Sequence, residues 1–405
     1  MPTNLREPRS GDRRAAEARR TLADALARAV ASPSPAAARL SEARTSVGFV
    51  VDGVATAVLL LDRAPPRVLE TAEPGEIDVE LSAAQAVELA AGRLRVGAAV
   101  ARGEVAARGP IAKFLDVDPV LRTLMAVTSD RLPPRGAAED AVAVPAGGHP
   151  VPAGCLAIEA RGVTATLGDR TVLRDVDLGV PAGSISVLLG PPTTGRSTLL
   201  HLVTGAATPT SGSVLLGGRP LSAMTRSELA GIRREIGVVP QRGALADRLT
   251  VFENVIAALT QHSGPLASDA HRRVVRHLEA FGLTRHTGDR PAALSNWARA
   301  RAALARATVA EPDLLLIDEP EAGLDPVRTL LLADLLQDQH AERGGTMLVV
   351  TRDVALARRI ADHLVVFDHG RSIHAGPPEV VLAADLPAVR RLVASPPRDQ
   401  PGPRA

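Results

Sequence analysis

Residues 190–198 have the spacing of a loop that binds nucleotide phosphates. The general pattern is G-x-x-x-x-G-K-[ST], in which backbone N–H groups surround the phosphates and the lysine reaches the β and γ phosphates. Gly190, Gly195 and Ser197 keep this frame, but Arg196 stands at the lysine position. An apolar run precedes the loop and a helical pattern follows it, so a helix N-terminus would add a positive dipole end. The sequence therefore predicts a phosphate site with an altered cation.

Two carboxylates at the end of a second apolar run supply matching acid chemistry. Residues 314–317 are Leu-Leu-Leu-Ile, and Asp318 and Glu319 follow them directly. An aspartate at such a strand end can hold Mg²⁺ beside bound phosphates, and the next glutamate can polarise an attacking water. Two acids at a strand end can also be a solvated turn or a helix cap. The acids alone leave both interpretations open.

Composition is typical of a globular protein with two or three domains. The 405 residues are 45% hydrophobic and 23% charged, and a net charge of +2 argues against a nucleic-acid footprint over the whole chain. Lys113 is the one lysine among 47 basic residues, and this arginine bias offers a neutral origin for Arg196. A single cysteine, Cys155, excludes an internal disulfide and fits a reducing, cytoplasmic compartment.

No membrane-crossing segment is expected from the sequence. The basic N-terminus has no apolar core after it, so a signal peptide is not expected, and the apolar run at 54–61 is far too short to span a bilayer. Any membrane role would come through a partner.

Changes in composition and patterning predict the domain boundaries. We expect a flexible basic N-terminus at 1–20, a smaller α+β domain at 21–130 and a Pro-rich linker at 131–154. Strands and helices then alternate over 155–384, which predicts an α/β domain with a parallel sheet, and 385–405 is a C-terminal tail.

Within the first domain, apolar spacing from Thr21 onward predicts a helix, and 47–61 reads as strands around a turn at Asp52-Gly53. Residues 77–81 alternate as a half-buried strand. Ser82 and Gln85 form a capping box for a helix that ends near Gly92. Alternation over 99–107 predicts a further strand, and 111–125 a short helical stretch broken near Pro119.

Over residues 156–380 the ordered motifs resemble the ATP-binding cassette (ABC) family. The resemblance rests on the phosphate loop, Gln241 after an apolar strand, the segment from Leu294-Ser295 into an alanine-rich helix, and Gly323-Leu324-Asp325-Pro326. It implies a P-loop NTPase fold with a helical subdomain, which binds ATP and Mg²⁺. It also implies a dimer of cassettes, homomeric or heteromeric, on a transmembrane permease, and no nucleic-acid partner.

The resemblance also implies roles for individual residues. Glu319 would polarise water, and Arg352 occupies the switch-histidine position. Mg²⁺ would be held with the nucleotide by Ser197, Gln241 and Asp318. The nucleotide-binding residues implied in this way are Gly190, Thr194, Gly195, Arg196, Ser197, Thr198, Gln241, Asp318, Ser295 and Asp325.

The departures from the family pattern concentrate on chemistry. Leu167 stands where an aromatic residue usually stacks on adenine, and Thr193 replaces a loop glycine. Arg196 places a planar guanidinium where a compact ammonium is expected. The signature Ser-Gly-Gly-Gln is Ser-Asn-Trp-Ala at 295–298, and an indole there should hold a partner's γ-phosphate away. Arg352 replaces the switch histidine but can still donate to phosphate. Each change also has a neutral explanation in the arginine bias, the scarcity of aromatic residues or local packing.

Hydrolysis should therefore be slow or absent. Losing one preorganised donor costs roughly 3–4 kcal/mol, or about 10²–10³ in rate. Each composite site takes its loop from one subunit and its signature from the other, and this chain is altered in both. Two readings stay open: a transport ATPase subunit with weak activity, and a non-hydrolysing regulatory or scaffold protein. A non-transport cassette protein is a third, although such proteins usually carry two cassettes.

Residues 45–125 resemble the sterol carrier protein 2-like lipid-transfer domain, an α/β sheet with helices over an apolar tunnel. The resemblance rests on 77–81, on 89–94 and on the run 103–115. It implies an acyl or sterol-like ligand and, for the whole protein, a lipidic or hydrophobic transport substrate. A generic α+β domain with an ordinary core is the alternative.

Overall fold

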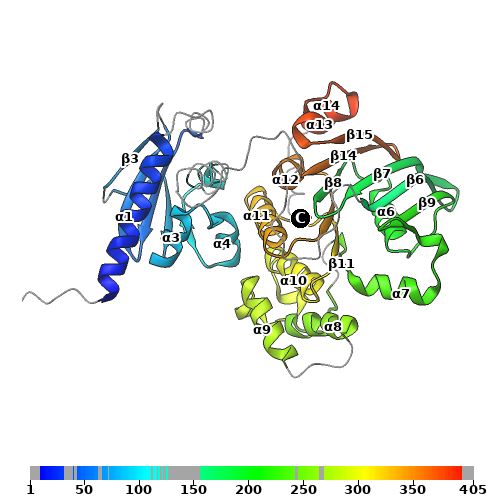
Figure 1. Ribbon diagram of the computed structural model, residues 1–405, viewed down its shortest axis with the longest axis horizontal. Coiled ribbons are helices and arrows are strands. Elements are labelled where there is room, and N and C mark those ends of the chain that lie inside the picture. Colours follow the sequence, from blue (N-terminus) through cyan, green and yellow to red (C-terminus); the bar gives the residue numbers. More distant parts are fainter. Residues whose placement is uncertain are drawn as a thin grey trace, which may run out of the picture. The chain divides into compact units, whose positions relative to one another are not determined.

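The structure, a computed structural model, describes residues 10–31, 40, 43–62, 66–71, 73–110, 113–115, 117–118, 121, 125, 156–241, 245–263 and 269–394. The chain divides into two compact units, Met1–Ala143 and Val144–Ala405 (Figure 1). The predicted linker at 131–154 lies outside the described residues, as do 1–9 and 395–405.

The first unit is built on a five-stranded sheet in the order β3-β2-β1-β4-β5. Its strands are β1 (Ser46–Val51), β2 (Val54–Leu60), β3 (Arg67–Leu69), β4 (Ile77–Leu81) and β5 (Ala106–Arg108). β1 runs parallel to β4, and the other neighbours are antiparallel. The predicted β1–β2 turn is present, with Asp52 and Gly53 both at positive φ.

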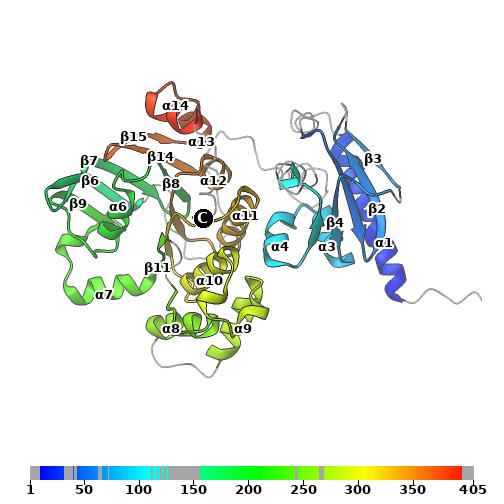
Figure 2. The same cartoon turned by 180° about the vertical axis from the view of Figure 1, so that it is seen from behind.

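Helices α1 (Ser10–Ala31) and α3 (Ala83–Ala90) cover one face of this sheet (Figure 2). The capping box at the start of α3 is confirmed: the Ser82 hydroxyl accepts from the Gln85 amide, and the Gln85 side chain accepts from the Ser82 amide. α1 begins at Ser10 and not at Thr21. Residues 10–20 are therefore helical and not a flexible lead-in, because Ala18 joins the apolar face that Leu22 and Leu26 bury in the core.

The predicted strand at 99–107 is wrong over its first half. Residues Val96–Arg102 form helix α4, and only Ala106–Arg108 pair as a strand. Ala98, Ala99 and Ala101 are all buried, so the alanines follow a helix packed on several sides and not a two-residue alternation. Gly103 ends the helix in the left-handed conformation, at φ 77°.

The second unit contains a six-stranded sheet in the order β11-β12-β13-β8-β14-β15. Its strands are β8 (Ile185–Leu189), β11 (Ile236–Val239), β12 (Leu314–Asp318), β13 (Thr346–Thr351), β14 (His363–Asp368) and β15 (Arg371–Gly376). All neighbours are parallel except β14 and β15. The predicted α/β domain with a parallel sheet is confirmed. β8, β12 and β13 are buried along their whole length, which explains their continuous apolar runs.

A separate antiparallel sheet joins β6 (Leu156–Leu167) and β7 (Arg170–Pro181) to β9 (Ser211–Leu216) and β10 (Arg219–Pro220), in the order β10-β9-β6-β7. Helices α6 (Arg196–Val203), α11 (Pro326–Arg343) and α12 (Val354–Ile360) belong to the parallel-sheet core. Helices α7 (Arg226–Glu235) and α10 (Asn296–Thr308) contact β11, and α8 (Val251–Ser263) and α9 (Ala270–Ala280) pack beside α10 (Figure 1).

The C-terminal tail predicted to begin at 385 is structured at its start. Helix α14 (Pro387–Ala394) follows α13 (Pro378–Ala383), and both pack against β14. Val389 is buried there and Arg391 pairs with Asp368 at 2.6 Å, so these residues belong to the folded unit. Among the described residues, no helix combines the length and apolar character needed to cross a bilayer.

Candidate nucleotide site

The phosphate loop, the two acids and Arg352 lie at the carboxyl ends of neighbouring parallel strands. β13 lies between β12 and β8, with Asp318 opposite Val350 and Thr351 opposite Leu189. The phosphate loop leaves β8, the acids end β12, and Arg352 follows β13. In open α/β sheets this edge is where ligands bind.

The loop at 190–195 is seated on β7 and has little room to change. Gly195 has φ 89°, and a Cβ there would lie 2.6 Å from both the Leu173 side chain and the Val172 carbonyl oxygen. The Thr194 hydroxyl donates to the Pro191 carbonyl at 2.9 Å. Thr193, which replaces the family's glycine, has φ 66°. A β-branched residue is strained in that region, so the loop keeps its shape at a cost.

Arg196 is buried and its guanidinium is engaged at the strand ends. Nη1 donates to the carbonyl oxygen of Thr351, and Nη2 lies 3.4 Å from Oε1 of Glu319. Burial lowers the pKa of the Arg196 guanidinium, and the negative charge of Glu319 opposes that shift. The residue at the lysine position is therefore paired with the carboxylate that is predicted to polarise water.

Glu319 is held by three side chains. Besides Arg196, the Gln241 amide nitrogen donates to Oε2 at 2.8 Å and Nη2 of Arg352 lies 3.3 Å from the same oxygen. Glu319 is 7% exposed and has φ 43°, which is unusual for a residue with a Cβ. Both of its carboxylate oxygens are occupied, so in this arrangement the residue is badly placed to polarise a water.

Asp318 and Ser197 fit the predicted cation site. Asp318 is buried, and burial raises the pKa of its carboxyl, while a hydrogen bond from Ser197 opposes the rise. Its Oδ1 is buried without a hydrogen-bond partner. A carboxylate oxygen without a partner and the Ser197 hydroxyl are oxygen ligands of the kind that Mg²⁺ prefers, whereas the Gln241 amide nitrogen is hydrogen-bonded to Glu319. Thr198 lies half-buried in the first turn of the same helix, α6.

The remaining predicted binding residues cap helices. Ser295 is the N-cap of α10 and accepts from the Ala298 amide at 3.2 Å. Asp325 is the N-cap of α11 and accepts from the Arg328 amide at 2.9 Å. Asn296 joins the two segments by donating to the Gly323 carbonyl at 2.9 Å.

Trp297 packs on its own helix. Its ring is half-buried and lies 5.1 Å from the Arg301 guanidinium carbon, one turn further along α10. Burial lowers the pKa of Arg301 to about 10. This cation–π contact stabilises the position of the indole beside the start of α10. The indole therefore adds a bulky group at that helix end. Leu167, at the predicted adenine position, is 57% exposed at the β6–β7 turn.

One residue at the site, Glu321, is not among the residues that the sequence predicts for it. Glu321 lies two residues after Glu319, and its Oε1 accepts from the Thr351 hydroxyl at 2.5 Å. The signal was present in the sequence, because Asp318, Glu319 and Glu321 form a run of three acids around one proline. Its partner, Thr351, is the last residue of a strand distant in the chain, and sequence spacing does not reveal this contact.

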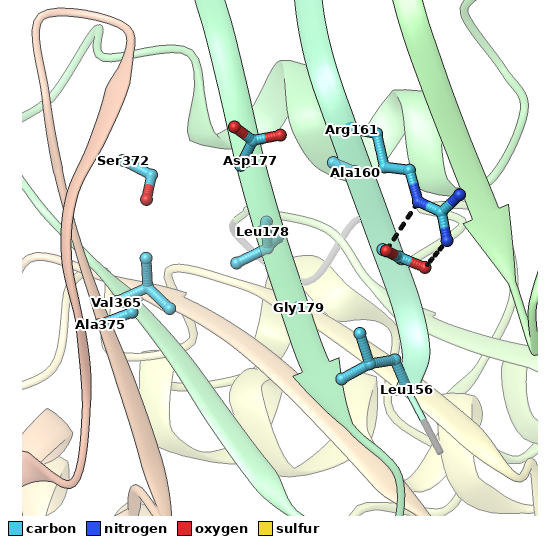
Figure 3. A pocket seen from close by; sticks show the side chains of 10 residues that line it. Leu156, Ala160, Arg161, Asp177, Leu178, Gly179, Val365, Ser372 and Ala375 are labelled. Carbon is cyan, nitrogen blue, oxygen red and sulfur yellow. Dashed lines mark hydrogen bonds and ion pairs between the residues drawn. The ribbon is translucent and has the colours of Figure 1, made fainter. Parts of the chain in front are cut away.

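A separate surface pocket lies between β6, β7, β14 and β15 (Figure 3). The Glu159–Arg161 ion pair at 2.7 Å, Asp177 and Ser372 line its polar side, and Leu156, Leu178 and Val365 its apolar side. None of the predicted nucleotide residues lines it.

Comparison with known proteins agrees with this geometry. The ABC transporter family profile matches residues 173–322. The chain is 37% identical over 238 residues to a probable ribonucleotide transport ATP-binding protein of Mycobacterium leprae, covering 59% of this chain and 69% of that one. It is 35% identical to the intermembrane phospholipid transport system ATP-binding protein MlaF of Escherichia coli K12, covering 58% and 88%.

Solved structures give the same result. A dimeric ATP-binding cassette in a post-hydrolysis state with ADP and phosphate is similar to this chain, with a TM-score of 0.51 and 28% identity. The similarity covers 55% of this chain and 98% of that one.

The strand-end site and parallel sheet define a P-loop nucleotide-binding protein. The chain belongs to the ABC transporter family, as an ATP-binding subunit of a transport system. Such cassettes bind ATP with Mg²⁺, form dimers and pair with permease subunits. The family match does not extend to the N-terminal unit, which is an additional α/β region.

Proposed function

We propose that this chain is the ATP-binding subunit of a transporter for a lipidic or hydrophobic substrate, and that it binds Mg-ATP weakly and hydrolyses it slowly. The observation that carries the slow turnover is the engagement of Glu319 by Arg196 at 3.4 Å and by Arg352 at 3.3 Å. The subunit would sit at the inner face of the membrane through its permease.

The mechanism has two separate costs. Mg-ATP must draw Arg196 away from Glu319 and the Thr351 carbonyl before the guanidinium can reach phosphate, and this cost weakens binding. A guanidinium that then contacts phosphate does so with a planar fork and not a point charge. The loss of a well-placed donor lowers the rate by about 10²–10³.

The opposite half of a composite site adds a further obstacle. In a cassette dimer the start of α10 would face the partner's nucleotide, and Trp297 adds an indole where the family has glycine. The Arg301 contact holds that indole in place, so moving it aside has an energetic cost of its own.

A lipidic substrate is supported by the N-terminal unit and by one relative. The unit's described core is almost entirely apolar, with Asp118 as its one buried charged residue among the described positions. Its short motifs resemble a lipid-transfer domain, and MlaF is named for phospholipid transport. Other relatives are named for ribonucleotide and for methionine transport, so the N-terminal unit decides our choice.

A regulatory or scaffold protein is the second candidate, favoured by the same engagement of Glu319. Under it, the cassette would bind nucleotide and dimerise without turnover, and the N-terminal unit would still bind lipid.

Calorimetric titration of the purified full chain with Mg-ATP, together with phosphate release, tests the nucleotide part. We expect Mg-ATP to bind and to be hydrolysed at a rate well below about 1 s⁻¹. Ordinary enzymes turn over at about 1 s⁻¹ or faster. Glu319→Gln should abolish what turnover there is, while Glu379→Gln, at an exposed position on α13, should leave it unchanged. Turnover of about 1 s⁻¹ or faster that depends on Glu319 would refute slow hydrolysis. Complete absence of turnover would favour the regulatory protein.

Binding of a fluorescent fatty acid to the full chain tests the lipid part. We expect saturable binding that unlabelled phospholipid displaces. If neither probe binds, the lipid assignment fails while the nucleotide assignment stands.

A further inference from the structure

Glu321 is a half-buried residue with one fully buried carboxylate oxygen, and the proposed reaction has no role for it. It lies in the segment that leaves β12, where Oε1 accepts from the Thr351 hydroxyl at 2.5 Å and from the Arg352 amide at 3.5 Å. Its other oxygen, Oε2, is buried with no hydrogen-bond partner. Leaving a buried acceptor unpaired costs about 1–3 kcal/mol. Stability alone therefore does not explain this carboxylate.

The residue that Glu321 holds is in contact with the phosphate loop. Thr351 is fully buried at the end of β13, and its carbonyl oxygen accepts from Nη1 of Arg196 and, at 3.4 Å, from the Gly190 amide. Its hydroxyl also accepts from the Asp353 amide at 3.0 Å. One threonine thus joins Glu321, both ends of the phosphate loop and the start of α12.

The next residue carries the guanidinium that reaches Glu319. Arg352 is 45% exposed along its side chain, so the protein interior does little to fix its direction. The fixed part is its backbone, which follows Thr351 and donates to Glu321. Holding the backbone therefore limits where the guanidinium can go.

The charges around Glu321 come from all the segments that meet here. Burial raises the pKa of Glu321 to about 7, and Glu319 on the same segment and Asp353 at the start of α12 raise it further, while the Thr351 hydrogen bond opposes them. The positive charges that face the cluster are Arg196 from α6 and Arg352. Glu321 is thus one member of a compact network and not a solvated turn residue.

We propose that Glu321 is a positioning residue for the Thr351–Arg352 segment: its carboxyl group anchors Thr351 and the Arg352 amide, and thereby aims the Arg352 guanidinium at Glu319. Among the described residues, Glu321 forms its hydrogen bonds with Thr351 and Arg352 and none with Glu319. The inference rests on the proposed nucleotide function for its purpose, and its geometry rests on the hydrogen bonds that Glu321 accepts.

Hydrogen–deuterium exchange on the nucleotide-free full chain tests the anchoring. In Glu321→Ala, amides of residues 349–355 and of the loop at 190–196 should exchange about tenfold faster, because their local opening loses its main restraint. Glu321→Gln keeps an oxygen that can accept from Thr351 and should change exchange less than about threefold. Glu379→Gln should change nothing. Exchange in α11 should stay as in the wild type in every variant, because a general loss of stability would raise it there too.

A double-mutant cycle on Mg-ATP affinity tests the aim of Arg352. Glu321→Ala should weaken binding about three- to tenfold in the wild-type background, and less than about twofold when Arg352→Ala is already present. Equal effects in both backgrounds would overturn the proposal, as would unchanged exchange at 349–355. Where Glu321→Ala does not fold, Thr351→Val removes the same hydrogen bond from the other side. If the wild type binds no Mg-ATP, the proposed function fails, and the exchange experiment still decides the role of Glu321.

Discussion

At the scale of single residues, the altered chemistry of this cassette centres on the side-chain contacts of Arg196. Its guanidinium bridges the Thr351 carbonyl and Glu319 from a buried position. A lysine has one ammonium group and a longer flexible stem, so it cannot hold both partners in the same planar arrangement. The arginine therefore changes how Glu319 is paired as well as how the loop can contact phosphate.

Arg196→Lys should raise the hydrolysis rate of the full chain by at least about tenfold, because it restores a point-charge donor and releases one side of Glu319. Phosphate release at saturating Mg-ATP measures the effect. Arg358→Lys, the same exchange at an exposed position on α12, is the matched control and should have no effect. A rate equal to that of the wild type would show that Arg196 does not limit turnover.

Thr193→Gly should stabilise the protein by about 1 kcal/mol. Relief of a β-branched residue at φ 66° gains about 1–3 kcal/mol, and the extra chain entropy of glycine takes back about 0.5–1 kcal/mol. Urea unfolding gives the free energy of unfolding. Thr193→Ala keeps a Cβ and should recover only a small part of the strain energy. A larger gain in unfolding free energy for alanine than for glycine would contradict the strain argument.

At the scale of elements, one histidine joins three helices outside the site. Nε2 of His277 on α9 donates to the Ala305 carbonyl on α10 at 3.0 Å, and its Nδ1 accepts from Arg343 on α11 at 3.1 Å. Burial, with the nearby charge of Arg343, lowers the pKa of His277 to about 4. The geometry requires the neutral ring, because a proton on Nδ1 would face another donor.

This arrangement makes the helical region sensitive to acid. The folded pKa lies below the unfolded value of 6.5, so the unfolded state binds the proton first and stability falls as the pH drops from about 6.5 towards about 4. The contribution is fully present above the unfolded pKa. His277→Gln can still donate to Ala305 and should lose less unfolding free energy between pH 7.5 and 5. His369→Gln, at an exposed turn, should behave as the wild type. Parallel pH profiles for wild type and His277→Gln would exclude this role.

At the scale of the whole molecule, the two altered half-sites act on the same nucleotide only when two cassettes meet. The relatives solved as dimers show that cassettes of this family associate. In this chain, the helix end that would face the partner's phosphate carries Trp297, held by Arg301. Association driven by Mg-ATP should therefore be weak.

Gel filtration with Mg-ATP measures that association. The experiment uses a Glu319→Gln background, which slows hydrolysis of the bound ATP. In that background, the variant with Trp297→Gly should form dimers at an ATP concentration about tenfold lower than the variant that keeps Trp297. Trp297→Phe keeps a bulky ring and should resemble the parent. Tight dimers with Trp297 in place would show that the indole does not obstruct the interface.

Much of the fold followed from local pattern. Fully buried strands such as Leu314–Asp318 appear as unbroken apolar runs, and the capping box at Ser82 and Gln85 marks a helix start by its own hydrogen bonds. The helix at Val96–Arg102 was missed because alternating alanines imitate a strand, and burial on several sides decided it. The start of α1 at Ser10 is hard to predict because Ala18, the buried residue before Leu22 among the described ones, carries little hydrophobic signal.

The sequence by itself determined which chemical groups this protein has at its phosphate loop and strand ends, because those motifs are local and their spacing is read along one chain. Only the tertiary structure decided how the groups pair. Parallel strands bring Arg196, Glu319, Glu321 and Thr351 together from segments far apart in the chain. The periodicity of apolar residues along the sequence does not predict those contacts. Charges attract according to distance in space, so the engagement of Glu319 exists only once the sheet has formed.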